Sequence, residues 1–168
     1  YLMGDYSIYP APAEGVLGGD IQGYEPLGLL ISGPRPAKYV AGEPEGDRIR
    51  VNYFWSEEDK TLKGRAWFGQ GAEGPPGYAH GGAVAALLDE VMGISGWAAG
   101  WKVVAAEITV RFQLPTVLGV VHTVEGRVTQ VNGRRITCEA KLSSPEGESV
   151  AIGSGTFMEM RPEMLEKL

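Results

Sequence analysis

Apolar and polar residues alternate along most of the chain after residue 47. At the start of this region Ile49, Val51 and Tyr53 alternate with Arg50 and Asn52. A period of two is typical of half-buried β-strands. The same alternation predicts six strands, over residues 48–55, 61–69, 102–114, 120–131, 134–143 and 149–160. Asn132-Gly133 stands between two of these segments and predicts a tight hairpin there.

A different pattern occupies residues 80–99, which contain no proline and are rich in alanine and leucine. This composition predicts a helix of four or five turns. At 100° per residue, large and mostly apolar residues share one face: Val84, Leu87, Leu88, Val91, Ile94 and Ser95. The opposite face carries small residues and one carboxylate: Gly82, Ala86, Asp89 and Gly93. Glu90 falls about 100° further round, so the two acids face different surroundings.

One apolar helix and six amphipathic strands have a simple packing solution. We expect an α+β fold in which the strands form one curved antiparallel sheet with the helix in its concave face. The four strands after the helix are expected to follow one another as a meander. Cys138 alternates in phase with Ile136, Ala140 and Leu142, so we expect a structural thiol in the core.

Residues 1–47 differ in composition from the rest of the chain. Glycine and proline together number 36 in the 168-residue chain, and this segment holds many of them. Both residue types disfavour long regular elements. We therefore expect 1–47 to form an extended arm, with one helical turn near Leu27–Ile31, packed on a single domain of residues 48–168.

Charge and cysteine content narrow the classes of function. A net charge of −6 and a pI near 5.0 argue against nucleic acid or an anionic membrane as the main partner. No apolar run reaches the length of a membrane helix. The single cysteine excludes an internal disulfide and is in keeping with a cytoplasmic location. No spacing typical of a metal site or phosphate loop is present, so we expect catalysis without a metal or organic cofactor.

The candidate catalytic residues lie at the start of the predicted helix, at His80-Gly81-Gly82. Helix starts carry free backbone N–H groups, and glycines let a substrate oxygen approach those donors. Donors for an oxyanion together with the carboxylate of Asp89 are the parts that acyl transfer needs. Two structural alternatives stay open at this point: His80 as a helix cap, and Asp89 as a polar residue in a subunit interface.

The small-residue face of the helix lacks the lysine and arginine of an ordinary solvent-facing surface. The simplest cover for it is a second copy of the chain. We therefore expect a homodimer with Asp89 in the seam between subunits. A homotetramer made of two such dimers is compatible with the sequence.

Residues 80–90, HGGAVAALLDE, resemble the HGG…D signature of hotdog-fold acyl-CoA thioesterases of the PaaI-like branch. Residues 108–115, ITVRFQLP, are similar to the strand that follows the helix in that branch. The resemblance implies a hotdog domain that dimerises edge to edge and hydrolyses acyl-CoA at the subunit interface. It implies that the Gly81 N–H polarises the thioester carbonyl, with His80 orienting it and Gly82 beside it. Asp89 would be the nucleophile or the base that activates water.

The chain departs from the family pattern at two positions. The family often supplies a serine or threonine ten residues before the strand's proline, where this chain has Ala105; Thr109 is the nearest hydroxyl. Many members carry a polar residue six before the histidine, where this chain has Gly74. Glu90 stays a candidate beside Asp89, because other hotdog branches use glutamate on this helix.

If the substrate is an acyl-CoA, its phosphates need local cations, and Lys102, Arg134 and Arg135 are candidates. Four tryptophans fit an aromatic or a fatty acyl pocket equally well. A non-catalytic acyl-CoA-binding or regulatory hotdog module is the main alternative to a thioesterase. A hydratase is a third reading, in which a histidine and an acid would be used in a different arrangement; the second histidine, His122, falls in the middle of a predicted strand.

Overall fold

The computed structural model of the chain describes residues 9–27, 39–41 and 45–166. These residues form two α-helices, α1 (Gly81–Ala98) and the short α2 (Pro162–Leu165), and one 3₁₀ turn, η1 (Gln70–Ala72). Their strands are β1 (Glu25–Pro26), β2 (Ile49–Ser56), β3 (Thr61–Phe68), β4 (Val103–Phe112), β5 (Val121–Asn132), β6 (Arg135–Ser143) and β7 (Ser149–Glu159). The predicted helix and all six predicted strands are present, with ends that differ by one or two residues.

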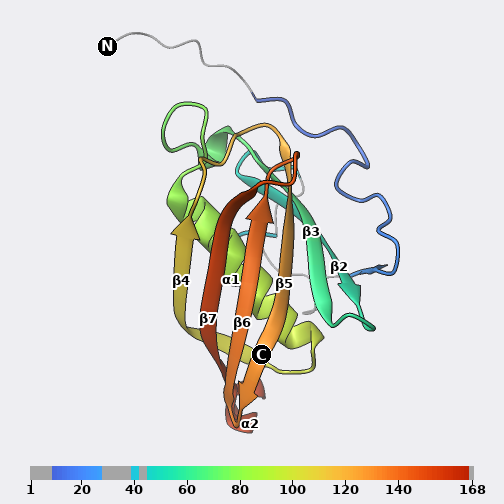
Figure 1. The fold of residues 1–168 in the computed structure, drawn as a ribbon, viewed down its shortest axis with the longest axis vertical. Helices are drawn as coiled ribbons and strands as arrows, with labels where there is room; N and C mark the ends of the chain where they lie inside the picture. The colour runs from blue at the N-terminus through green and yellow to red at the C-terminus, as the bar shows by residue number, and fades with distance from the viewer. Residues whose placement is uncertain (1–8, 28–38, 42–44, 167–168) are drawn as a thin grey trace.

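The strands form one antiparallel sheet in the order β1-β2-β3-β5-β6-β7-β4, which curves around α1 (Figure 1). The expected helix inside a curved sheet is therefore confirmed. The predicted hairpin between β5 and β6 is also confirmed: Asn132 pairs with Arg135, and Gly133 takes the positive φ of 58° that the turn requires.

The expected meander of the last four strands is wrong in one place. β4 pairs with β7 and lies at the sheet edge, while β5 pairs with β3. The connection between β4 and β5 is too long for a hairpin and crosses the helix start, where the Ala79 N–H donates to Thr116 O at 2.8 Å. Among the described residues, this crossover leaves one edge of β4 without a neighbouring strand and lets the sheet enclose α1.

The core lies between α1 and the concave face of the sheet. The predicted apolar face of the helix is buried, with Leu87, Leu88 and Val91 fully shielded from solvent. Full burial of each such side chain stabilises the fold by about 1.5–3 kcal/mol. Gly126 on β5 allows the close approach of the helix, because a β-carbon there would lie 2.6 Å from Val91 Cγ1. On the opposite face, Ala86, Asp89 and Gly93 are only partly buried.

The described part of the N-terminal arm lies over the outer face of β2 and β3. Arg65 donates to the backbone oxygen of Gly19, and the Leu27 N–H donates to Tyr53 O at 2.8 Å. Phe54 and Trp67 point to this outer face and are each only 2% exposed. The helical turn expected near Leu27–Ile31 lies, apart from Leu27 itself, outside the described residues.

Two side chains of interest belong to the core. Cys138 is fully buried, and burial raises the pKa of its thiol to about 11, so it is a protonated structural residue at neutral pH. His122 is also buried, with Nε2 2.9 Å from Val117 O.

None of the described helices is long and apolar enough to span a bilayer. The described residues contain no cluster of three or more histidine, cysteine or acidic side chains able to hold a metal ion.

Candidate active site

The helix start presents one backbone donor. His80 is the N-cap of α1, and its Nδ1 accepts the Gly82 N–H at 2.8 Å. The Ala83 and Val84 N–H groups donate to His80 O. Within the described residues, the Gly81 N–H is thus the donor of this turn that has no acceptor. Because Nδ1 accepts, a neutral His80 ring carries its proton on Nε2 and can donate from there.

The loop before the helix is held against its neighbours by backbone hydrogen bonds. His80 N donates to Ala72 O at 2.7 Å. The Glu73 carboxylate accepts the Gly77 N–H at 2.9 Å and the Tyr9 hydroxyl at 3.3 Å, which ties the arm to this loop. Gly74 is required here, since a β-carbon would lie 2.8 Å from His80 Cα. The missing polar side chain at position 74 therefore has a steric cause.

Asp89 lies eight residues after Gly81, which corresponds to about 12 Å along the helix axis. It shares one side of α1 with Gly96, which faces Val103 at the start of β4. Asp89 therefore borders the side of the helix that faces the edge strand. Burial raises the pKa of its carboxyl above the usual value of 3.8. A desolvated carboxylate of this kind is a stronger base than one in water.

Glu90 points to the other side of the helix. The Tyr53 hydroxyl on β2 donates to Glu90 Oε1 at 2.8 Å. Tyr53 is 5% exposed, and its burial, followed by the negative charge of Glu90, raises its pKa well above 10. Alternation along residues 48–55 predicts only that Tyr53 lies in a strand, with its side chain toward the core. That position could have indicated a polar partner, because a buried tyrosine hydroxyl usually has one.

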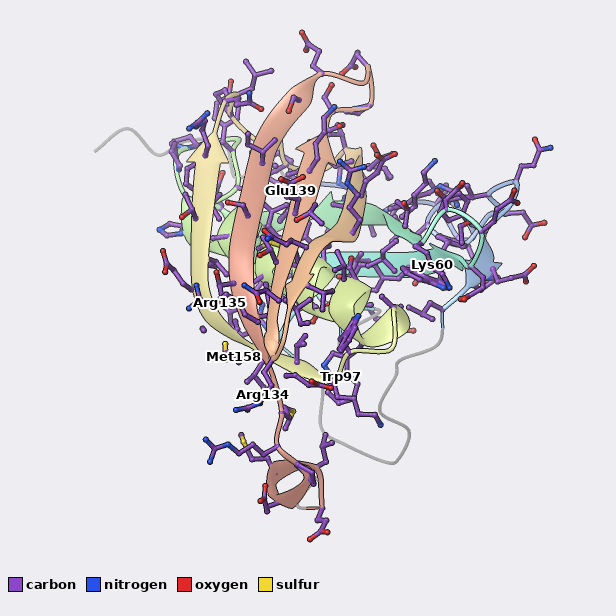
Figure 2. All side chains as sticks on the ribbon, turned by 60° about the horizontal axis from the view of Figure 1, so that its bottom comes forward. Lys60, Trp97, Arg134, Arg135, Glu139 and Met158 are labelled. Carbon is purple, nitrogen blue, oxygen red and sulfur yellow. The ribbon has the colours of Figure 1, made fainter. Side chains whose placement is uncertain are left out.

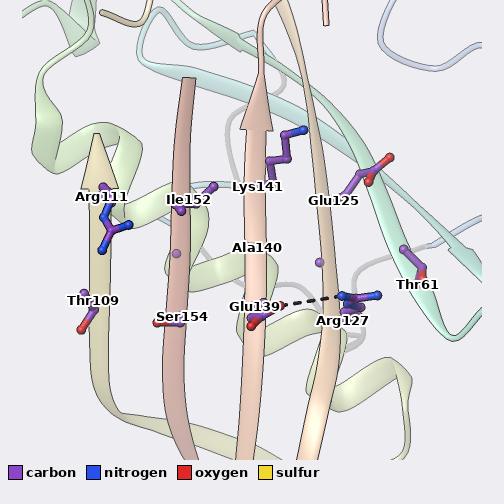
Figure 3. Close-up of a pocket in the computed structure, with 12 residues that line it drawn as sticks. Thr61, Thr109, Arg111, Glu125, Arg127, Glu139, Ala140, Lys141, Ile152 and Ser154 are labelled. Carbon is purple, nitrogen blue, oxygen red and sulfur yellow. Dashed lines mark ion pairs between the residues drawn. The ribbon is translucent and has the colours of Figure 1, made fainter. Parts of the chain in front are cut away.

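The structure separates Thr109 from Asp89. Thr109 lies on the outer face of the sheet, in register with Ser154, and lines a depression of about 590 Å³ with Arg111, Glu139 and Lys141 (Figure 3). Arg127 and Glu139 form an exposed ion pair across its floor. This depression lies on the opposite side of the sheet from α1, so it is not the site that the helix start and Asp89 define.

The remaining predicted positions are distributed along β4 and at the far end of the sheet. Ala105 is exposed on β4, beside a register shift between Ala105 and Glu107. Lys102, Arg134 and Arg135 are exposed at the end of the sheet near the last turn of α1. The structure thus brings His80, Gly81 and Gly82 together and sets the three cations apart from them.

An apolar surface adjoins the helix start and was not anticipated from the sequence. The Phe112 ring covers Gly81, and a β-carbon on that glycine would lie 3.4 Å from Phe112 Cζ. Five of the ten exposed large apolar residues in the described part of the chain lie here or on the helix side of β4: Tyr78, Ile108, Phe112, Leu114 and Val117; Val104, in register with Met158, points to the outer face. An apolar strip along an unpaired strand edge is typical of a protein interface.

Comparison with known proteins shows that the chain is similar to thioesterases. The family model described as thioesterase superfamily matches residues 76–151, which include the helix start and Asp89. Acyl-coenzyme A thioesterase THEM4 of Xenopus laevis is 32% identical over 102 residues, covering 61% of this chain and 46% of the relative. The chain thus spans about half the length of this curated relative.

Solved structures show the same fold. The BH2602 protein of Bacillus halodurans, solved with CoA, is 29% identical, with a TM-score of 0.55 over 62% of this chain and 71% of that one. The PaaI protein of E. coli, from the phenylacetic acid degradation operon, is 17% identical, with a TM-score of 0.60 over 67% and 80% of the two chains. Residues 76–151 thus match the thioesterase superfamily model, and the fold is the hotdog fold of the solved thioesterases that the chain resembles.

Proposed function

We propose that the chain hydrolyses an acyl-CoA, or a related acyl thioester, to the free acid and the thiol. The observation that carries this proposal is that α1 carries two groups suited to acyl transfer. One is the Gly81 N–H, which has no acceptor among the described residues, and the other is the partly desolvated carboxylate of Asp89. The superfamily match and the CoA present in the BH2602 structure support the substrate class. Glu90 is less suited to the role of base, because Tyr53 holds one of its oxygens on the β2 side.

The spacing of the two groups bears on how many protomers build one site. An oxyanion donor lies about 3 Å from the reacting oxygen, and a base or nucleophile reaches the carbon through a contact of similar length or one water. Gly81 and Asp89 are about 12 Å apart along one rigid helix, and the lean of side chains toward the helix start shortens this by only a few ångström. A single helix therefore spaces them too widely for one carbonyl.

A second copy of the chain could bring Gly81 and Asp89 of different protomers within reach of one carbonyl. The unpaired edge of β4 and the apolar strip beside it are the features that a symmetric dimer would bury. In the dimer that we propose, Gly81 of one protomer and Asp89 of its partner face the same thioester. Dimers could associate further into tetramers without changing this site.

The proposed reaction has two steps of bond making and breaking. The Gly81 N–H and the Nε2–H of His80 polarise the thioester carbonyl. Asp89 either removes a proton from water as the water attacks the carbonyl carbon, or attacks the carbon itself and is later released by water. In both routes the C–S bond breaks, and the CoA sulfur leaves as a thiolate that takes up a proton.

The direct test is thiol release from a panel of acyl-CoAs that includes short, long and aryl acyl groups. Turnover of at least one of them is expected, with Asp89→Asn lowering kcat by about 10²–10⁴ and Glu90→Gln having a much smaller effect. Binding of acyl-CoA without any turnover across the panel would favour the non-catalytic binding module instead. A requirement for Glu90 and not Asp89 would reverse the assignment of the base.

Subunit mixing tests the shared site. Gly81→Pro and Asp89→Asn dimers are each expected to be inactive. After exchange of subunits, half of the dimers are mixed, and each mixed dimer holds one intact site, so about a quarter of wild-type activity should return. No recovery after verified exchange would place both groups in one protomer. We also propose a cytoplasmic location, in keeping with the single cysteine being buried and free.

A further inference from the structure

The described N-terminal arm begins at Tyr9, outside the residues that match the superfamily model, and reaches the loop before the helix start. In Figure 1 this part of the arm lies beside the loop that precedes α1 and the crossover between β4 and β5. The Tyr9 hydroxyl donates to Glu73 Oε1 in the loop at 3.3 Å. The Tyr9 ring lies against Gly119 in the crossover, where a β-carbon would be 3.1 Å from Tyr9 Cδ1. Tyr9 therefore contacts both segments.

The loop and the crossover together fix the position of the helix start. The Leu118 N–H donates to Gly77 O at 3.0 Å, and the Ala79 N–H donates to Thr116 O at 2.8 Å. One residue separates Ala79 from Gly81, which carries the proposed oxyanion donor. A shift of the loop against the crossover would therefore move the Gly81 N–H.

The loop is exposed and has few backbone donors. Residues 73–76 are exposed, and two of them are prolines, which have no N–H. The Gly77 N–H donates to the Glu73 carboxylate at 2.9 Å, through the same oxygen that accepts the Tyr9 hydroxyl. The Tyr9 ring is partly buried and packs against the hydrophobic core. Tyr9 thus gives this loop an apolar contact that connects it to the rest of the fold.

We infer that Tyr9 is a positioning residue for the proposed oxyanion donor. Its ring holds the loop against the crossover, so that the Gly81 N–H keeps the direction needed to polarise the thioester carbonyl. This inference rests on the proposed function and extends it to the arm. Packing of the ring carries the effect, because a hydrogen bond of 3.3 Å between exposed groups contributes little. Tyr9 acts through Gly81 and does not contact the substrate.

The probe is Tyr9→Ala, which removes the ring, and Tyr9→Phe is the conservative variant. Tyr9→Ala should lower kcat by about 10- to 100-fold, since a misplacement of about 1 Å can have an effect of that size. Its KM should change less than about threefold, because the donor acts mainly on the transition state. Tyr9→Phe keeps the ring and should keep kcat within about threefold of wild type. Equal losses in both variants would overturn the role of the ring.

Tyr24 in the same arm provides the matched control. Its hydroxyl donates to Asp59 Oδ2 at 3.4 Å, and the Lys63 ammonium lies 4.6 Å from its ring centre. These contacts are at the β2–β3 hairpin, at the opposite end of β3 from the crossover, which contacts Phe68. Figure 2 shows Lys60, the neighbour of Asp59, on the side of the molecule away from β4. Tyr24→Ala should leave kcat unchanged, and a loss equal to that of Tyr9→Ala would overturn the inference.

A double-mutant cycle with Gly81→Pro shows whether Tyr9 acts through the donor. Gly81→Pro has no N–H to position, so the addition of Tyr9→Ala should lower its residual kcat less than about twofold. A further loss by the full factor measured in the wild-type background would show that Tyr9 acts elsewhere and would overturn the inference. Wild-type kcat in Tyr9→Ala alone would also overturn it. If Tyr9→Ala does not fold, Tyr9→Leu, which keeps apolar bulk without the flat ring, replaces it in the same comparisons.

Hydrogen exchange separates failure of this inference from failure of the proposed function. If the wild type releases thiol and the cycle fails, the role of Tyr9 is overturned while turnover stands. If the wild type hydrolyses no acyl-CoA, exchange of the Gly77 and Ala79 amides decides, because both are hydrogen-bonded in or beside the loop. Exchange that is about tenfold faster in Tyr9→Ala, and unchanged in Tyr24→Ala, would uphold the role of Tyr9 in holding the loop without catalysis. Equal exchange in the wild type and Tyr9→Ala would overturn it.

Discussion

Replacement of Gly81 by proline removes the N–H from the proposed oxyanion site and adds a pyrrolidine ring beside Phe112. Proline lacks the backbone N–H, and its φ near −65° suits the first residue of a helix. His80 is extended, with φ −61° and ψ 137°, which is the conformation that a residue before proline prefers. Since the Gly81 N–H donates to no other group in the described structure, the substitution breaks no hydrogen bond within the fold.

The expected loss follows from the role of that donor. Removal of one oxyanion donor lowers kcat by about 10²–10³ in enzymes of this type. Gly81→Ala is the matched control because it keeps the N–H and adds one methyl group. That methyl would lie 3.4 to 3.8 Å from the Phe112 ring, which is an ordinary packing distance. Gly81→Ala should therefore keep kcat within a few fold of wild type.

The assay is thiol release under saturating substrate, with circular dichroism and thermal unfolding measured on the same samples. Gly81→Pro should unfold cooperatively within a few degrees of wild type, so that its loss of kcat reports chemistry. A Gly81→Pro variant with nearly full kcat would refute the assignment of Gly81 as the oxyanion donor. Equal losses in the alanine and proline variants would show that bulk beside Phe112, and not the N–H, is what the site cannot accept.

Three further predictions test the rest of the site. Burial raises the pKa of Asp89, so the folded state binds its proton more tightly than the unfolded state; Asp89→Asn should therefore raise the melting temperature at pH 7, and this gain should vanish below about pH 3, where both states are protonated. Tyr53→Phe removes the hydrogen bond that the buried tyrosine hydroxyl donates to Glu90 Oε1 and should lower the free energy of unfolding by about 1–3 kcal/mol in urea titrations while kcat changes less than threefold. Sedimentation equilibrium should give a multiple of the 18.0 kDa chain mass, and Ile108→Glu, at the centre of the unpaired β4 edge, should shift it toward the monomer; a wild-type monomer at micromolar concentration would contradict the shared site.

The helix and the strands could be predicted because each has a characteristic spacing of apolar residues along the chain. Leu87 and Asp89 fall on opposite faces of α1 by helical geometry alone, and the burial of the first and partial exposure of the second agree with that. The position of β4 could not be predicted in the same way. Alternation in residues 103–112 predicts a strand, but it does not identify the neighbouring strand, and the crossover through Thr116 places β4 beside β7.

The same limit explains which site residues the sequence identified. His80, Gly81 and Asp89 are separated by helical spacing, so their directions follow from the chain itself. Tyr53 meets Glu90 across 37 positions, and Phe112 covers Gly81 across 31, through packing that no local pattern encodes. Both unpredicted contacts help to define what Asp89 can do: one keeps the neighbouring acid turned away, and the other places an aromatic ring beside the donor.

The depression that Thr109 lines and the proposed site lie on opposite sides of the sheet. The depression of about 590 Å³ lies on the outer face, among exposed and partly paired charges, whereas the helix side presents an open apolar strip along an unpaired strand. A carboxylate that is only partly desolvated in one chain would lose more water when a second β4 covers it, and its pKa would rise further. Dimer formation would then both complete the site and strengthen its base. The acid limb of the kcat profile should consequently lie above the pKa that NMR titration gives for Asp89 in a monomeric Ile108→Glu variant, and coincidence of the two values would separate catalysis from assembly.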